Sequence, residues 1–247
     1  MTIAKKDLSI LKKFDFSVQP VGVKFFPKKP DMVPRLEGKM AFCEMLKKAQ
    51  EGHAFFVDKE NHTCEAGLYV LGQADALEPY VSGEFGARLQ IFEDTRSASR
   101  LYLHIPKIDR GVVNYLAFSP LNKLPFSPDL LIVLAETNQT EILLRAMSYR
   151  TGKIWASKFT PAIGCAWTYV YPYLTGELNY NITGFGHGMK RRKLFPEGLQ
   201  IVSIPYDLLT PMLHALRDMP WVLPAYEPDG SEFVKHLVIE LGLPLPE

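Results

Sequence analysis

The sequence predicts an α+β fold in which helices flank a mixed β-sheet, built partly from two repeated ββα units. Three observations carry this prediction. Short apolar runs typical of strands alternate with segments of helical period along the chain. The 247 residues are 47% hydrophobic and 22% charged, which is ordinary globular composition. Finally, residues 112–149 and 178–217 share short matching motifs in the same order.

The first half of the chain is expected to alternate helices and strands. Apolar residues at Ile3, Leu8, Leu11 and Phe14 are spaced along one helical face. Further on, Thr63 is expected to be the N-cap of a short helix that ends before Gly72. The expected elements are a helix over 3–14, strands over 21–26 and 54–57, a helix that begins near 40 and is closed by Gly52, a helix over 64–71, and an interrupted helical region over 79–103.

The second half predicts the same sequence of elements twice. Strands are expected over 112–118, 130–135, 178–182 and 199–204, and helices over 139–149 and 206–217. The matching motifs are Val113-Asn114-Tyr115 with Leu178-Asn179-Tyr180, Ile132-Val133 with Ile201-Val202, and Leu144-Arg145-Ala146 with Leu213-His214-Ala215. We expect the two units to pack about a pseudo-twofold axis in one sheet.

Composition sets the domain organisation and excludes several classes of protein. We expect one domain over 1–220 and a Pro-rich, acidic C-terminal tail over 221–247 with a short helix near 234–241. The net charge of +1 argues against a nucleic-acid partner. The longest aliphatic run, 130–135, is too short to cross a membrane, and no signal peptide is visible. Three cysteines indicate reduced thiols, so a cytoplasmic location is expected.

The three cysteines are the first candidate site. Cys43, Cys64 and Cys165 are dispersed and form no C-x-x-C pair, which argues against a zinc finger or ribbon. Cys64 is expected at a helix start, and Cys165 follows the helix-start signature Thr160-Pro161. The free N–H groups there favour a thiolate, the form that binds soft metals. Brought together, the three could hold an iron–sulfur cluster, with His53 or His62 as a weaker fourth candidate. Buried cysteines that only pack are the alternative.

A glycine-rich loop followed by basic residues is the second candidate site. The segment GFGHGMKRRK places Gly184, Gly186, His187 and Gly188 before a basic run that includes Arg191 and Arg192. Glycines let a backbone approach a ligand closely, and exposed N–H groups with arginines suit a carboxylate or phosphate. The pattern is neither a Walker loop nor a dinucleotide-binding fingerprint. A solvated hairpin loop is the alternative.

Two further observations do not decide the function of the chain. The aromatic run Trp167, Tyr169, Tyr171 and Tyr173 could wall a planar cofactor, and core packing explains it equally well. No serine-triad, paired-carboxylate or H-E-x-x-H arrangement is visible. The sequence therefore leaves open whether the chain is an enzyme.

Several short motifs in order resemble the family called domain of unknown function 169. The similarity spans roughly residues 21–217 and rests on VGVKFF, FCEMLKKAQEGHAFF, TCEAGLYVLG, the glycine-rich loop and EGLQIVSIPYDLL. Its marks are Cys43-Glu44, Cys64 with Gly67 and Gly72, the glycines from Gly184 to Gly188 with Arg191 or Arg192, and Ile204-Pro205. The resemblance implies a cytoplasmic protein of the kind found in anaerobic archaea and bacteria. It implies no particular reaction. His187-Gly188-Met189 departs from the family's usual loop, so the equivalent arginine is undecided.

Together these patterns give one leading functional hypothesis and two alternatives. The leading one is a redox-linked protein that binds an iron–sulfur cluster or soft metal through Cys43, Cys64 and Cys165, with a small anionic ligand at the Gly/Arg loop. The first alternative is a metal-free binder of an anionic small molecule. The second is an assembly subunit of an anaerobic enzyme complex whose acidic tail contacts a partner. A homo-oligomer is compatible with each.

Overall fold

Six strands form one antiparallel sheet with helices on both faces. The computed structural model describes residues 6–244, so Ile3 of the expected first helix lies outside the described residues. The strands are β1 (Val21–Phe26), β2 (Phe55–Val57), β3 (Tyr115–Pro120), β4 (Leu130–Ala135), β5 (Asn179–Ile182) and β6 (Gln200–Pro205). Their order across the sheet is β2-β3-β1-β4-β6-β5. The α+β prediction is confirmed.

The helices mostly follow the sequence pattern. They are α1 (Phe42–Gln50), α2 (Glu65–Val70), α3 (Glu78–Val81), α4 (Glu84–Arg88), α5 (Thr95–His104), α6 (Thr137–Ser148), α7 (Tyr171–Thr175), α8 (His187–Arg191), α9 (Leu209–Asp218) and α10 (Gly230–Glu240). The expected N-terminal helix is a 3-10 helix, η1 (Ser9–Phe14), and a π-helical turn, η4 (Ala166–Val170), leads into α7. No helix within residues 6–244 has the length and apolar character needed to cross a membrane.

The sheet is not mixed in its strand pairing, which corrects one part of the prediction. All five strand pairs run antiparallel. Parallel pairing is restricted to two isolated bridges, Arg35 with Phe56 and Met40 with His62. Adjacent strands β2 and β3 are joined by a long connection that contains α2, α3, α4 and α5, and they still pair antiparallel.

The two ββα units are present as β3-β4-α6 and β5-β6-α9, and their helices share one core. Val133 in β4 pairs directly with Val202 in β6, its counterpart in the repeat. Helices α6 and α9 both cover the same face, where Ala146 and its counterpart Ala215 are buried. The units are not fully symmetric, however. Strand β5 pairs with β6, whereas β1 lies between β3 and β4.

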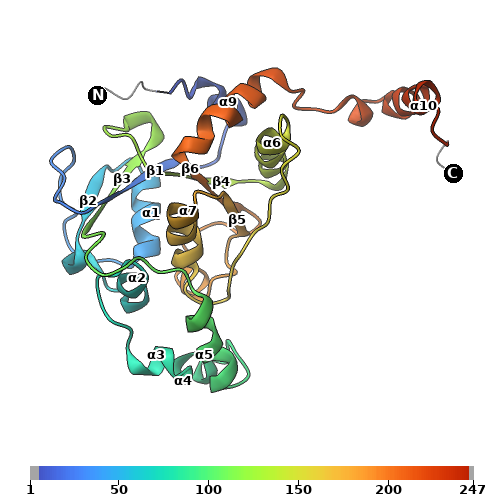
Figure 1. The fold of residues 1–247 in the computed structure, drawn as a ribbon. Coiled ribbons are helices and arrows are strands. Elements are labelled where there is room, and N and C mark those ends of the chain that lie inside the picture. The colour runs from blue at the N-terminus through green and yellow to red at the C-terminus, as the bar shows by residue number, and fades with distance from the viewer. Residues whose placement is uncertain (1–5, 245–247) are drawn as a thin grey trace.

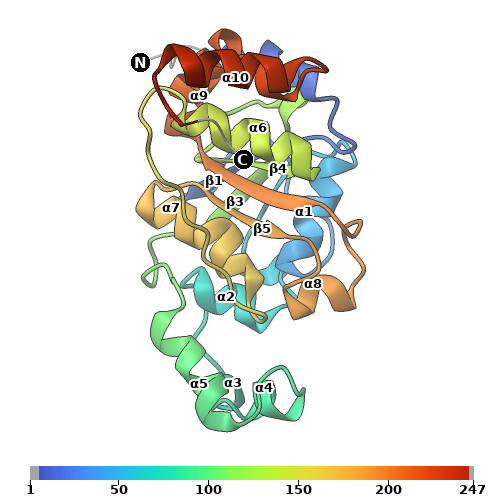
Figure 2. The same cartoon turned by 90° about the vertical axis from the view of Figure 1, so that its right-hand side faces the viewer.

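The opposite face of the sheet carries the larger core and faces the candidate site. Helices α1 and α2, the π-helical turn and α7 supply buried side chains to this core. Figure 1 shows α6 and α9 on one side of the sheet and α1, α2 and α7 on the other. The three short helices α3, α4 and α5 lie beyond α2, at the end of the molecule farthest from α9 (Figures 1 and 2). We call residues 78–104 the three-helix segment.

Candidate functional site

A cavity of about 440 Å³ lies between the three-helix segment and the larger core. Four parts of the chain form its walls: the starts of α1 and α2, the three-helix segment, residues 162–165 and the helix α8 with the glycine before it. The aromatic and aliphatic side chains from the three-helix segment are Tyr80, Phe85, Leu89, Ile91, Phe92, Ala98, Leu101 and Tyr102. The walls are therefore mainly apolar, as in most small-ligand sites.

All three cysteines line this cavity, although they come from three separate elements. Cys43 is in the first turn of α1, Cys64 is the N-cap residue of α2, and Cys165 directly precedes the π-helical turn. The N-cap of α2 is therefore one residue later than the expected Thr63. Cys43 and Cys165 are buried, while Cys64 is partly exposed. The structure brings the thiols together; their role as ligands stays a prediction.

The expectation that a helix start makes Cys165 a thiolate is wrong. Burial raises the pKa of Cys165 well above its ordinary value, and the neighbouring Cys64 and Cys43 raise it further. Burial also raises the pKa of Cys43 to about 11, although the positive charge of Arg192 acts in the opposite direction. Loss of water around the sulfur outweighs the favourable helix dipole. In the protein without a ligand, both thiols are therefore protonated at neutral pH.

The glycine-rich loop is not an open hairpin, because its second half forms the short helix α8. Gly186, His187 and Gly188 line the cavity, whereas Gly184 is not among the lining residues and has a left-handed φ of +82°. The His187 N–H donates to the carbonyl of Pro161 at 2.8 Å, and the Met189 N–H to that of Gly186 at 3.0 Å. These N–H groups are already engaged within the protein, so the arginines are better placed than the backbone to bind an anion.

The loop lies against the segment that carries Cys165. A Cβ on Gly186 would lie 3.7 Å from the Cα of Gly164. A Cβ on Gly164 would lie only 2.8 Å from the Cζ of Phe159. The ring of Phe159 in turn stacks on that of Phe185, with 5.6 Å between their centroids. Close backbone packing thus fixes one wall of the cavity.

The two arginines of the loop both line the cavity but have different surroundings. Arg192 is half-buried; its Nη1 donates to the carbonyl of Gly188 at 3.1 Å, and its Nε lies 3.8 Å from Oε1 of Glu44. The other carboxylate oxygen of Glu44 accepts from the Ala41 N–H at 2.5 Å and caps α1. Arg191 is exposed. Arg192 is therefore the more firmly positioned cation, and Glu44 links it to the helix that carries Cys43.

The other candidates from the sequence lie away from the cavity walls. Trp167, Tyr169 and Tyr171 are buried in the larger core, and Tyr173 packs against it, so core packing explains the aromatic run. His53 is exposed. His62 is buried behind Phe42, and neither ring nitrogen has a hydrogen-bond partner. Burial lowers the pKa of His62 to about 4, against the opposing effect of Asp58.

Sequence reasoning missed the side chains that the three-helix segment contributes to the cavity. Their signal was weak: Gly83 and Gly86 interrupt an aromatic region that otherwise has helical spacing. In the structure, Gly83 has φ +84° and packs so closely on α5 that a Cβ would lie 2.1 Å from the carbonyl oxygen of Thr95. Glycine is required there for α4 and α5 to pack together.

The structure has no prearranged site for a single metal ion in the part of the chain it describes. Within residues 6–244, no group of three or more His, Cys, Asp or Glu side chains could hold a metal ion. The cavity thus combines protonated thiols, aromatic walls and a cationic edge. Chemically, this arrangement suits a ligand that has both an apolar part and a negative charge.

Comparison with known proteins supplies a family and one relative. The family of domain of unknown function 169, described as uncharacterised ArCR, matches residues 9–215. An uncharacterised protein of Methanocaldococcus jannaschii is 24% identical over 197 residues, which cover 76% of this chain and 81% of the relative. No solved structure gives a significant match. The matched residues include every wall of the cavity and end before the acidic tail.

Proposed function

Because the chain belongs to the family of domain of unknown function 169, whose description assigns no reaction, we propose a function from its own residues: the cavity binds a small molecule with an apolar body and an anionic group. The observation that carries this proposal is the composition of the walls, in which aromatic and aliphatic side chains meet two arginines at one edge. A volume of about 440 Å³ lies within the range of roughly 300–1,000 Å³ that is common for small-molecule sites.

The two parts of the ligand have separate counterparts in the cavity. The apolar body would lie against the three-helix segment, where Phe85, Leu89 and Phe92 present rings and a branched chain. The anionic group would lie at Arg192 and Arg191, since a guanidinium binds carboxylates and phosphates with two parallel hydrogen bonds. Glu44 lies 3.8 Å from Arg192, a contact long enough for a ligand carboxylate to compete with it.

A fluorescent probe with the same two parts tests this proposal. The anionic dye 1-anilinonaphthalene-8-sulfonate has an aromatic body and a sulfonate, and N-phenyl-1-naphthylamine is its neutral analogue. We expect the folded protein to bind the anionic dye about tenfold more tightly, because only the sulfonate can pair with the arginines. The double variant Arg191→Ala/Arg192→Ala should remove this difference and leave binding of the neutral dye unchanged.

The chain offers a control with the same change in net charge. Lys190 and Lys193 flank the arginines, are exposed, and are not among the lining residues. The double variant Lys190→Ala/Lys193→Ala should therefore keep the preference for the anionic dye, as should Cys64→Ala. If the arginine and lysine variants lose the preference for the anionic dye equally, the overall charge of the protein attracts the dye, and the proposal is overturned.

A second candidate function is supported by the convergence of all three cysteines on the cavity. Three thiolates are a ligand set for an iron–sulfur cluster or a soft metal. Because no three such side chains within residues 6–244 are already placed to hold a metal ion, the cysteines on the cavity would have to move together on binding. The thiols must lose protons when they bind metal, and the pKa of Cys43 is raised to about 11. Metal binding would therefore release protons, and its affinity would increase with pH.

Anaerobic purification followed by iron and sulfide analysis tests this second function. If a cluster is bound, the native protein is coloured and contains iron and acid-labile sulfide, and Cys43→Ser or Cys165→Ser loses both. Cys64→Ser, at the partly exposed position, should lower cluster content less. A colourless protein with neither element, which still binds the anionic dye, would leave only the first function.

A further inference from the structure

The C-terminal helix α10 exposes an apolar face that no other part of residues 6–244 covers. Within α10, Gly230 is the only buried residue, whereas Phe233, Leu237 and Ile239 are exposed. Leu241 and Leu243, just after the helix, are exposed too. Figure 1 shows α10 standing away from the body of the molecule. An isolated helix shorter than about 12–15 residues is only marginally stable in water, so this helix needs a surface to pack on.

A second apolar surface of the same chain is also uncovered. A groove of about 920 Å³ runs between α6, residues 153–157 and strand β5. Its apolar lining includes Leu144, Ile154, Trp155, Ile182 and Phe185. Ile154 is 90% exposed, which is unusual for so apolar a side chain. Contiguous apolar surface of this kind commonly marks an interface.

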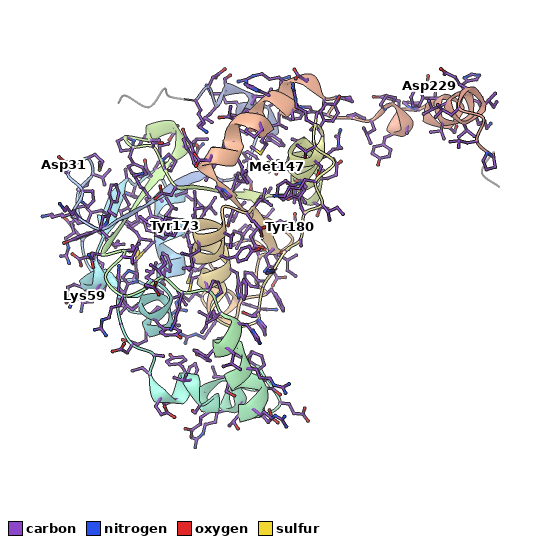
Figure 3. All side chains as sticks on the ribbon, viewed as in Figure 1. Asp31, Lys59, Met147, Tyr173, Tyr180 and Asp229 are labelled. Carbon is purple, nitrogen blue, oxygen red and sulfur yellow. The ribbon has the colours of Figure 1, made fainter. Side chains whose placement is uncertain are left out.

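The helix and the groove lie on the same side of the molecule. In Figure 2, which shows the right-hand side of Figure 1, α10, α6 and β5 all face the viewer. Figure 3 labels a residue of each: Asp229 before α10, Met147 on α6 and Tyr180 on β5, which also lines the groove. A second copy placed on this side would meet both surfaces at once.

The charges of the two surfaces favour their association. Residues 221–247 hold five acidic residues and one lysine, although the whole chain has a net charge of +1. The rest of the chain is therefore positive. At the groove, Lys153 supplies positive charge, whereas Arg145 is paired with Glu141 at 2.7 Å and donates to the carbonyls of Pro220 and Trp221 at 2.6 Å each. An acidic helix and a groove with a basic rim attract each other.

The connection to α10 is too rigid for the helix to fold back easily onto its own groove. Pro220, Pro224 and Pro228 restrict residues 219–229. The 3-10 turn Pro224–Tyr226 also packs tightly on α10, because a Cβ on Gly230 would lie 2.2 Å from the carbonyl oxygen of Ala225. The Gly230 N–H donates to the carbonyl of Glu227 at 2.8 Å. The turn and the helix thus form one arm directed away from the body (Figure 1).

We propose that α10 of one copy docks in the α6–β5 groove of a second copy, and that the exchange is reciprocal. Two such contacts related by a twofold axis form a closed dimer, the commonest type of homo-oligomer. The apolar face of α10 would cover Ile154 and its neighbours, and the groove would in turn complete the packing that α10 lacks. The arm lies outside residues 9–215, which match the family, so the dimer would be built on an addition to the family's common core.

Sedimentation of the full chain at several concentrations tests the dimer. The unmodified chain should be a dimer at micromolar concentration. Phe233→Asp/Leu237→Asp on the arm and Ile154→Asp in the groove should each raise the dissociation constant by about 100-fold. Leu103→Asp is the matched control, since Leu103 is 76% exposed on α5, far from both surfaces (Figure 1), and should leave the dimer intact.

A mixture of the two variants distinguishes exchange from other ways of pairing. One arm variant and one groove variant together contain a single intact arm and a single intact groove, which can combine. The mixture should therefore dimerise more strongly than either variant alone. A monomeric unmodified chain would overturn the proposal. So would a dimer that Ile154→Asp leaves unchanged, since this would indicate direct pairing of two α10 helices.

Discussion

The two ββα units have the same order of elements, but the connections between their two strands differ. In the first unit, residues 121–129 connect β3 to β4 with little more than a 3-10 turn. In the second, residues 183–199 connect β5 to β6 and contain α8, whose last residue Arg191 and C-cap residue Arg192 line the cavity. The helices that follow, α6 and α9, remain equivalent and share one core. The scaffold is thus shared by the two units, and the arginines that we propose to bind an anion lie in the connection of only one of them.

The largest expected effect tests the equivalence of the two helices. Leu143 in α6 and Met212 in α9 occupy matching positions and are both fully buried. Leu143→Ala and Met212→Ala should each lower the free energy of unfolding by about 2–5 kcal/mol, because each leaves a cavity in the same core. Urea unfolding followed by tryptophan fluorescence measures both. A large loss in one variant and none in the other would refute the equivalence, and Leu103→Ala should have little effect.

A somewhat smaller effect is expected in acid, on the face of the sheet that carries the cavity. The pKa of His62 is lowered to about 4 from an ordinary value of 6.5. The folded state therefore favours neutral His62, and this stabilisation is present above pH 6.5 and lost as the pH falls through 4. The free energy of unfolding should fall by about 3 kcal/mol over this interval. In His62→Leu the decrease between these pH values should be correspondingly shallower; an unchanged slope would contradict the assignment.

An effect of about 2–3 kcal/mol is expected in alkali from the cavity itself. The pKa of Cys43 is raised from 9.0 to about 11, so the folded state favours the protonated thiol. This stabilisation is present below pH 9 and is lost as the pH rises through 11. Urea unfolding across this range should show the loss in the unmodified chain and a smaller one in Cys43→Ala. Equal losses in both would show that Cys43 is not responsible.

The smallest expected effect concerns the close packing of residues 159–164, which lie against the second unit's connection. Gly164→Ala places a Cβ against the ring of Phe159 at 2.8 Å, so the ring must move, at a cost of about 1 kcal/mol. The melting temperature should fall slightly. The free energy of binding of the anionic dye should decrease by more than the free energy of unfolding does. Leu103→Ala is the control, because Leu103 is exposed on α5 and is not among the lining residues. If both substitutions act alike, the packing of Gly164 does not shape the cavity.

The local hydrophobic pattern was enough to predict the strands that form from one short, continuous run of apolar residues. The expected strands over 21–26 and 130–135 have the bounds found for β1 and β4, since each is a short, continuous apolar run. The π-helical turn Ala166–Val170 and the short helix α8 were not predicted. Both depend on packing: the first lies wholly in the core, and the second is held by contacts with residues 161 and 164.

The candidate site was predictable in its residues but not in its physical state. Reactive residue types pointed to the cysteines and the Gly/Arg loop, and most of these residues line one cavity. The protonation of Cys43 and Cys165 could not be predicted, because it depends on burial by residues distant in the sequence. The same holds for the apolar wall from the three-helix segment, whose short helices carry little pattern of their own. The ligand set itself stays a prediction.

The position of β4 in the sheet has a consequence for synthesis of the chain on the ribosome. β4 pairs with β1, which is made earlier, and with β6, which is made about 70 residues later. Until residues 200–205 leave the exit tunnel, β4 is an edge strand with one row of unpaired N–H and C=O groups. Its six residues, Leu-Leu-Ile-Val-Leu-Ala, are all apolar and are all buried in the finished protein. Such a nascent edge can pair with another chain. Mispairing of β4 with another chain is therefore a hazard of this interval and ends when β6 pairs with it.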